Sequence, residues 1–278
     1  MADPYQFDID SAARHESGEG SSQQWSTTLG PGWSIGDKPN GGYVLAAIAR
    51  VMGEAVTRSG APQHPHPLTI TGHYLRPSEA GPAELDVRIL RTGRTFTSAH
   101  TTFVQAGKAR LHVLATFGNL DDQHGPSAQT GTAPELPPPE HCITRTEADG
   151  FPPGSSMGTQ VDVRLHPDTA WIGGGLTEVA ESLAWIRFAD DRPVDPAALV
   201  FFCDALPPAV FAVLPGKTWV PTVELTVHVR AQPKPGWLRA ITRTSHLVDG
   251  RFEEDCELWD GDDRLVALSR QLGMVLSS

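Results

Sequence analysis

The sequence contains only three cysteines, Cys142, Cys203 and Cys256, and none of them belongs to a C-x-x-C pair. So few cysteines, odd in number, argue against a disulfide framework and a zinc site, and they fit a reducing cytoplasm. Basic residues are also scarce, since 22 Lys and Arg oppose 33 Asp and Glu for a formal net charge of −11. A nucleic-acid surface needs a basic stripe, so we expect no nucleic-acid partner.

Long apolar runs are missing as well. No run approaches the roughly 18 residues that a membrane span needs. The polar and acidic N-terminus, MADPYQFDID, is not typical of a signal peptide. With 39% hydrophobic and 20% charged residues, the composition is that of an ordinary globular protein. We therefore predict a cytoplasmic protein without membrane contact, and 278 residues are enough for two domains.

The first half of the chain shows one long helix followed by strands. Asn40 can cap the helix, apolar residues follow at helical spacing from Tyr43 to Val56, and Gly60 and Pro62 end it. Runs that are typical of strands, separated by turns containing glycine, then cover residues 68–75, 83–90, 95–105 and 109–117.

The second half repeats this order after a segment rich in Pro, Gly, Ser and Thr that is typical of a linker. Two strands are predicted before a second helix, at 160–165 and 179–188. That helix starts with Asp195 as N-cap and Pro196 at its first position, and Pro207-Pro208 must kink or end it. Further strands are predicted at residues 220–229, 237–246, 252–259 and 264–276.

Four landmarks recur between the halves at nearly one spacing. The two members of each pair are separated by 154 to 157 residues: Arg76 and Arg230, Gly93 and Gly250, Gly118 and Gly273, Asn40 and Asp195. Such agreement indicates gene duplication. We predict an α+β chain of two tandem repeats, each a helix followed by an antiparallel meander. The N-terminal repeat would span residues 1–118, the linker 119–158 and the C-terminal repeat 159–278.

Several short motifs carry a resemblance to a known family. They are Asn40-Gly41-Gly42, Tyr74-Leu75-Arg76-Pro77, the hairpin 90–96 (LRTGRTF), Asp204, 221–224 (PTVE) and 269–273 (SRQLG). In this order, and with the duplication, the sequence resembles the type II acyl-CoA thioesterases. That resemblance implies a double hot-dog fold, an acyl-CoA substrate, no cofactor or metal, and assembly into a homo-oligomer.

The resemblance also implies the site. Asp204, Thr222 and Gln271 match the Asp, Thr and Gln with which this family holds its hydrolytic water. A carboxylate can act as general base, while a hydroxyl and an amide can orient the water without adding charge. The first-half positions at the repeat spacing are near Ala49 and at Thr116, and neither offers a carboxylate or an amide. One site per chain, built by the second repeat, is therefore predicted.

Each candidate also has a plainer interpretation. Asp204 interrupts the apolar stretch FFCDALPP of the second helix, where an isolated carboxylate is costly to bury unless it is paired or functional. It would otherwise lie on a solvated helix face. Thr222 and Gln271 could be ordinary polar strand residues, and their meaning depends on Asp204. Cys203 is expected to be a buried core thiol rather than a nucleophile.

Two other patterns suggest different chemistry and are disfavoured by their context. Residues 32–36 (GWSIG) satisfy G-x-S-x-G, yet loop sequence lies on both sides instead of a strand and a helix. His64 and His66 have no carboxylate or cysteine close by in sequence, so surface histidines are expected rather than metal ligands.

Two alternatives to a thioesterase stay open at this point. A hydratase or dehydratase of the same fold usually carries a D-x-N-P-x-H signature, and residues 37–40 (DKPN) are only a scrambled version of it. A non-catalytic acyl-CoA-binding module is the second alternative, because fold alone does not fix function.

Four arginines could contact the phosphates of coenzyme A: Arg91, Arg94, Arg239 and Arg243. For each of them considered alone, a solvated surface position is the favoured interpretation.

Overall fold

The computed structural model describes residues 4–122, 124–145, 154–169, 176–214 and 219–276. The helices are α1 (Gln6–Asp10), α2 (Gly41–Arg58) and α3 (Pro196–Phe202). The strands of the first half are β1 (Ala13–Glu19), β2 (Ser22–Leu29), β3 (Ser34–Ile35), β4 (Lys38–Pro39), β5 (His66–Tyr74), β6 (Gly81–Thr92), β7 (Thr97–Gln105) and β8 (Lys108–Gly118). Those of the second half are β9 (Ile143–Thr144), β10 (Val161–Leu165), β11 (Ala180–Phe188), β12 (Thr222–Val229), β13 (Leu238–Thr244), β14 (Leu247–Val248), β15 (Arg251–Trp259) and β16 (Leu265–Met274).

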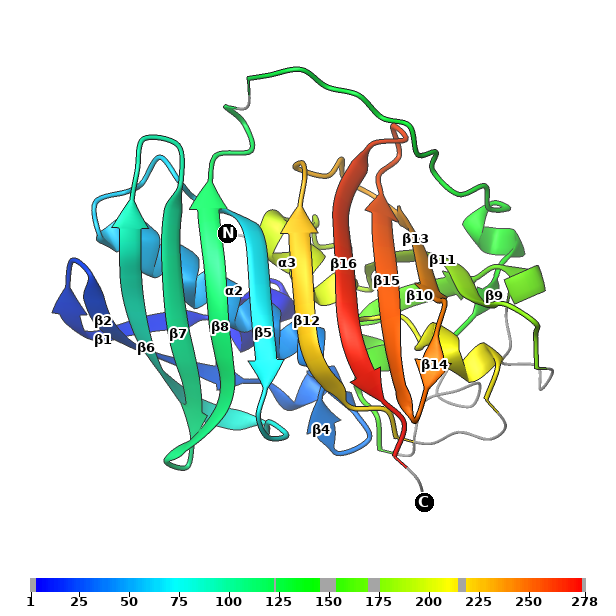
Figure 1. Cartoon of the computed structure of the whole chain (residues 1–278), viewed down its shortest axis with the longest axis horizontal. Coiled ribbons are helices and arrows are strands. Elements are labelled where there is room, and N and C mark those ends of the chain that lie inside the picture. The colour runs from blue at the N-terminus through cyan, green and yellow to red at the C-terminus, as the bar shows by residue number, and fades with distance from the viewer. Residues whose placement is uncertain (1–3, 123, 146–153, 170–175, 215–218, 277–278) are drawn as a thin grey trace.

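The two repeats share one 14-stranded antiparallel sheet. Its order is β1-β2-β6-β7-β8-β5-β12-β16-β15-β13-β11-β10-β9, with β14 attached to β15. Figure 1 shows α2 and α3 on the same face of this sheet, with α2 behind the strands of the first repeat and α3 behind the centre of the sheet, where β5 and β12 meet. The order within the first repeat, β2-β6-β7-β8-β5, is mirrored in the second by β11-β13-β15-β16-β12. The predicted α+β fold of two helix-plus-meander repeats is confirmed.

At the centre of the sheet, the strand pairing brings equivalent positions of the two repeats together. β5 and β12 pair antiparallel, with Thr71 opposite Thr226. Their hydroxyl oxygens lie 2.8 Å apart, and the two residues are 155 positions apart in the sequence. This spacing equals the repeat spacing read from the landmarks, so a local two-fold relation between the repeats passes between these two threonines.

The helices differ more between the repeats than the sequence suggests. α2 has 18 residues and is capped by Asn40, whose side chain accepts from the Tyr43 backbone N–H. α3 has only seven, with Asp195 as the predicted N-cap. Placing Asp204 within the helix is wrong, because α3 ends at Phe202 and Asp204 lies in the turn that follows. Pro207 has no backbone N–H, and its ring would clash with the carbonyl group of Cys203 in a continued helix, so α3 cannot run on through this turn.

The first 39 residues, for which the sequence predicted no element, add α1, β1 and β2 to the first repeat. Phe7 of α1 is fully buried and contacts the rings of Trp33, Tyr43, Phe188 and Phe201. This aromatic cluster joins residues of both repeats. The largely polar sequence of β1 gives no strand signal, because most of its side chains are exposed.

The segment predicted as a linker also carries structure of its own. It contains β9, which pairs with β10, and a short 3₁₀ turn at Met157–Thr159. The hydroxyls of Ser155 and Ser156 accept hydrogen bonds from the backbone N–H groups of Gly36 and Ser34. This segment is therefore fastened to the loop before α2. Residues 123 and 146–153 lie outside the described residues.

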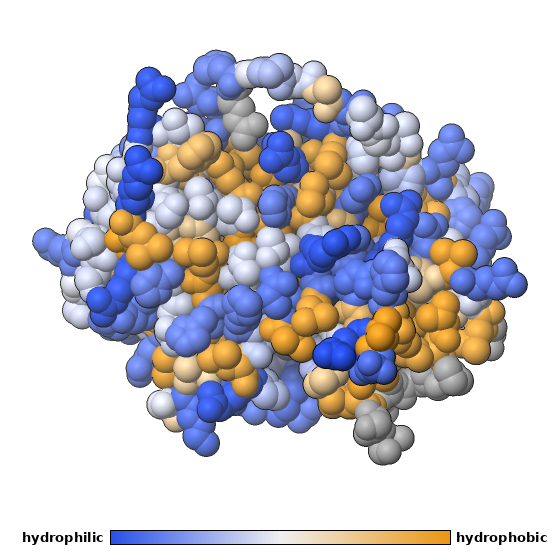
Figure 2. Space-filling model, viewed as in Figure 1, coloured by the Kyte–Doolittle hydropathy of each residue, from blue (hydrophilic) through white to orange (hydrophobic). Residues whose placement is uncertain are grey.

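The face of the sheet turned away from the helices is largely polar, with separate apolar patches between the hydrophilic side chains (Figure 2). The exposed apolar residues include Leu90, Leu114 and Leu272. Among the described residues, no helix combines the length and the apolar character that a membrane crossing would need.

Candidate active site

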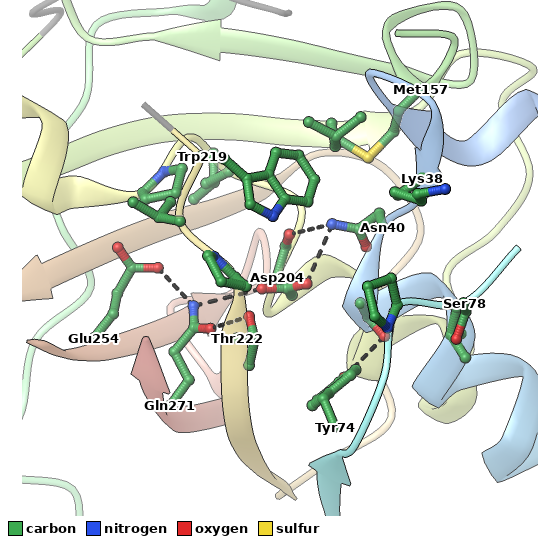
Figure 3. Close-up of a pocket in the computed structure, with 18 of the residues that line it drawn as sticks. Lys38, Asn40, Tyr74, Ser78, Met157, Asp204, Trp219, Thr222, Glu254 and Gln271 are labelled. Atoms are coloured by element: carbon green, nitrogen blue, oxygen red, sulfur yellow. Dashed lines mark hydrogen bonds between the residues drawn. The ribbon is translucent and has the colours of Figure 1, made fainter. Parts of the chain in front are cut away.

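Asp204, Thr222 and Gln271 converge on one cavity of about 480 Å³. Figure 3 shows the three side chains side by side at its wall, although they come from the turn after α3, from β12 and from β16. The first repeat also lines the cavity, through residues such as Asn40 beside Asp204, Tyr74 and Lys38. All three residues selected from the sequence are thus brought together, at the junction between the repeats.

Asp204 is held by the first turn of α2, which belongs to the other repeat. The Gly42 backbone N–H donates to Asp204 Oδ2 over 2.7 Å, and Asn40 Nδ2 donates to the same oxygen over 3.2 Å. Asn40 Nδ2 also donates to the Asp204 carbonyl oxygen over 2.8 Å. The positive end of the α2 dipole therefore faces the carboxylate. The sequence predicted a site built by the second repeat, and it gave no sign of these polar contacts from the first repeat.

Thr222 and Gln271 form a second group of hydrogen bonds beside Asp204. Thr222 Oγ1 donates to Gln271 Oε1 over 2.8 Å. Gln271 Nε2 makes a long contact of 3.4 Å with Asp204 Oδ1. Because Oδ2 already accepts two hydrogen bonds, Oδ1 is the carboxylate oxygen with the most remaining capacity to accept a proton.

The sequence reasoning missed a fourth polar residue, Glu254 of β15. Its side chain lines the same cavity and only 4% of the residue is exposed. Gln271 Nε2 donates to Glu254 Oε1 over 2.9 Å, and the Ala209 backbone N–H donates to Glu254 Oε2 over 2.5 Å. A signal existed, because Glu254 alternates with Phe252 and Cys256 on the inward face of its strand.

Both carboxyl groups are less acidic than usual. Burial raises the pKa of Asp204 to about 6, against the opposing effect of the hydrogen bonds from Gly42, Asn40 and Gln271. Burial raises the pKa of Glu254 to about 8, and the negative charge of nearby Asp204 raises it further. At neutral pH, Asp204 is therefore mainly a carboxylate and Glu254 mainly a neutral acid. Two carboxyl groups with separated pKa values are typical of sites that transfer protons.

These pKa values lead to a pH dependence. If Asp204 must be ionised, kcat/KM, which reports the ionisation of the free enzyme, falls about tenfold for each pH unit below about 6. An unburied aspartate would place this decline near pH 4. Folding stability has the opposite sign, because a carboxyl whose pKa is raised in the folded state loses stability as pH rises from about 4 to 6. Measurements of kcat/KM and of thermal unfolding across pH 4–8 test both slopes, and a kcat/KM that stays flat down to pH 4 contradicts the role of Asp204.

The remaining wall of the cavity is mainly apolar. Its largest hydrophobic side chains are Trp219, Phe211, Phe252, Met157 and Leu206. Among the described residues, the lining cations are Lys38, Arg76 and Arg145, and the lining does not include the four arginines considered from the sequence. Such a cavity, apolar with a few convergent polar groups, suits a ligand with a hydrocarbon part and one reacting polar group.

Three further predictions have a clear outcome. Cys203 is buried, as expected. Ser34 starts the two-residue strand β3, so the G-x-S-x-G pattern does not form a strand-to-helix elbow. The prediction that His64 is a surface residue is wrong, because it is only 2% exposed. Its ring nitrogens lie 2.9 Å from Thr97 Oγ1 and 3.1 Å from the Arg94 carbonyl oxygen, and these contacts satisfy its polar atoms when it is buried.

Comparison with known proteins identifies the family to which the chain belongs. The family model of the acyl-CoA thioesterase N-terminal domain matches residues 29–118, and that of the acyl-CoA thioesterase C-terminal domain matches residues 139–275. The chain belongs to the acyl-CoA thioesterase family. An uncharacterized protein of Mycobacterium tuberculosis is 30% identical over 264 residues, covering 87% of this chain and 88% of that protein. A thioesterase-like protein of Talaromyces wortmannii, TwmA, is 24% identical over 92% of this chain and 89% of its own length.

Solved structures show the same double hot-dog architecture. A Thermobifida fusca protein, described as a candidate thioesterase II, superposes with a TM-score of 0.84 at 31% identity, with full coverage of both chains. A hot-dog protein of Alicyclobacillus acidocaldarius gives a TM-score of 0.81 at 24% identity, covering 99% of each chain. The dehydratase domain of PpsC from Mycobacterium tuberculosis shares the fold with a TM-score of 0.58 at 16% identity, covering 96% of this chain and 99% of that one.

Proposed function

We propose that this protein is an acyl-CoA thioesterase that hydrolyses an acyl-CoA to the free acid and CoA with a water molecule activated by Asp204. The observation that carries the proposal is the convergence of Asp204, Thr222 and Gln271 at the wall of a mainly apolar cavity. Family membership makes a thioester the expected substrate. The predicted homo-oligomer, the cytoplasmic location and the domain limits at residues 118 and 158 stay predictions.

The hydrogen bonds give each side chain a part in the reaction. Thr222 donates its proton to Gln271, so its oxygen can accept one proton of a water molecule. Asp204 Oδ1 can accept the other, since Oδ2 is occupied by Gly42 and Asn40. A water held between these two oxygens has a lone pair free to attack the thioester carbonyl carbon, and this orientation lowers the entropic part of the barrier.

The steps then balance without a further reactant. The water oxygen bonds to the carbonyl carbon while Asp204 takes one water proton, and the carbonyl oxygen becomes the negative oxygen of a tetrahedral intermediate. That intermediate collapses, the carbon–sulfur bond breaks, and the CoA sulfur leaves with the proton that Asp204 returns. The N-terminal end of α2, which lies against Asp204, favours negative charge in this region throughout.

The direct test is release of free thiol from acyl-CoAs of several chain lengths by the purified protein. Cleavage of at least one acyl-CoA supports the proposal. Addition of water to an enoyl-CoA without thiol release would instead indicate a hydratase, and saturable acyl-CoA binding without turnover would indicate a binding module. Either of these two results contradicts the proposed function.

A further inference from the structure

Glu254 is a buried acid that the mechanism above does not use. Both of its carboxyl oxygens are engaged, one by the Ala209 backbone N–H and the other by the side-chain amide of Gln271. Burying a carboxyl group costs free energy unless its oxygens accept hydrogen bonds. One of the two hydrogen bonds to Glu254 comes from Gln271, a residue of the proposed site. Figure 3 shows Glu254 on the side of Gln271 opposite Thr222.

The amide of Gln271 is oriented by three partners at once. Its nitrogen faces Glu254 Oε1 at 2.9 Å and Asp204 Oδ1 at 3.4 Å, and its oxygen accepts from Thr222. An amide rotated by half a turn would point its oxygen at the Asp204 carboxylate, which is ionised at neutral pH and has no donor to offer. Of the two contacts to nitrogen, the one with Glu254 is the shorter, so it holds the amide in place more closely.

We propose that Glu254 is a positioning residue, which holds one N–H of Gln271 so that the rest of the amide meets Asp204 and Thr222 in the geometry that the reacting water requires. This inference rests on the proposed thioesterase function. Glu254 itself is anchored by the start of the 3₁₀ turn Ala209–Ala212, which follows the Asp204 turn in the chain. The turn that carries the base and the strand that carries the amide are thereby tied together.

Glu254→Gln tests the proposal because it keeps the shape of the side chain. An amide has a single oxygen, which can accept from Ala209 or from Gln271 but leaves an N–H facing the other donor. We expect kcat to fall about tenfold, the usual effect of losing one buried hydrogen bond, with little change in KM. Glu254→Asp, which is shorter by one methylene, should lose the same contact and give a similar decline. Glu253→Gln is the matched control, since Glu253 contacts Ser245 and His246 and does not line the cavity.

A double-mutant cycle distinguishes a role of Glu254 that depends on Gln271 from a role that does not. If Glu254 acts through Gln271, adding Glu254→Gln to Gln271→Ala causes no further loss of kcat. An equal fold-loss in both backgrounds overturns the proposal, because Glu254 would then act on the substrate or the water directly. Thermal unfolding of every variant shows that the comparison is made between folded proteins.

The pH profile gives a readout that a purely structural role would not move. Ionised Glu254 adds a negative charge beside Gln271 and Asp204, which disfavours a negatively charged tetrahedral intermediate at this site, so kcat/KM of the parent should decline above about pH 8. That decline should disappear in Glu254→Gln and persist in Glu253→Gln. If the decline above about pH 8 is unchanged in Glu254→Gln, the proposed role of Glu254 is contradicted. Among the described residues, the other titratable groups around Glu254 are Asp204 and Cys203 near the end of α3, Asp255 and Cys256 on β15, and Arg145 in the cavity lining.

The geometry is also testable without turnover. The side-chain NH₂ signals of Gln271 in a proton–nitrogen NMR spectrum are identified by their loss in Gln271→Ala. They should shift in Glu254→Gln and not in Glu253→Gln, and identical signals in Glu254→Gln and the parent would overturn the contact. If the parent cleaves no thioester, the proposed function fails and Glu254 has no catalytic part, while these signals still report whether it holds Gln271.

Discussion

Asp204→Asn is expected to lower kcat for acyl-CoA hydrolysis by about 10²–10⁴-fold, the usual contribution of a general base. The asparagine keeps the size of the side chain and can still accept the Gly42 N–H bond through its amide oxygen. It cannot take a proton from water at neutral pH. Thiol release measured at saturating acyl-CoA gives the result, and KM should change far less than kcat.

Stability provides the control for this variant. Ionised Asp204 is disfavoured by burial in the folded protein, so its neutral replacement should not lower the free energy of unfolding at pH 7. Thermal unfolding at pH 7 checks this. A variant that keeps parental kcat shows that Asp204 is not the base, whatever its stability.

Gly42→Ala is expected to lower kcat on the order of 10²-fold, although it adds only one methyl group. A Cβ at Gly42 would lie 2.6 Å from Asp204 Cβ and 2.9 Å from the Phe201 carbonyl oxygen. The second neighbour is backbone, so the methyl cannot be accommodated unless the turn carrying Asp204 moves. A displacement of about 1 Å in a catalytic group can cost about 10²-fold. Steady-state kinetics with the same acyl-CoA measure the effect.

The same helix supplies the matched control. A Cβ at Gly53, also in α2, would find its nearest neighbour at 3.5 Å, an ordinary contact. Gly53→Ala should leave kcat unchanged and raise the free energy of unfolding by about 0.5–1 kcal/mol, because alanine favours a helix interior. Equal kinetics for Gly42→Ala and Gly53→Ala would show that the fit between α2 and Asp204 does not matter for the reaction.

The parts of the fold that the sequence predicted are those with strong local signals. α2 has a cap and an apolar face, and α3 begins with Asp195 followed by Pro196. The strands β5–β8 alternate and end at glycine turns. β1 and α1 lack such signals, because α1 is short and is stabilised by the tertiary contacts of Phe7. These elements are stabilised by contacts with residues distant in the sequence, and the local sequence pattern does not reveal such contacts.

The candidate site was likewise predictable from the sequence only in part. Asp204, Thr222 and Gln271 were found through the resemblance, and the structure places them together. Glu254 could have been found, since an acid at a buried strand position is unusual. The donation from Gly42 to Asp204 could not, because it joins residues 162 positions apart across two repeats. Glycine also gives no side-chain signal for such a contact.

The central claim is that a water held by Asp204 attacks the thioester directly. Hydrolysis of an acyl-CoA in H₂¹⁸O with enzyme in excess over substrate, limited to one turnover, tests it most directly. Mass spectrometry of both products should find one ¹⁸O in the released acid and none in the protein. Incorporation of ¹⁸O into the Asp204 carboxyl group with unlabelled acid would instead show attack by Asp204 itself through an anhydride, and would contradict the account.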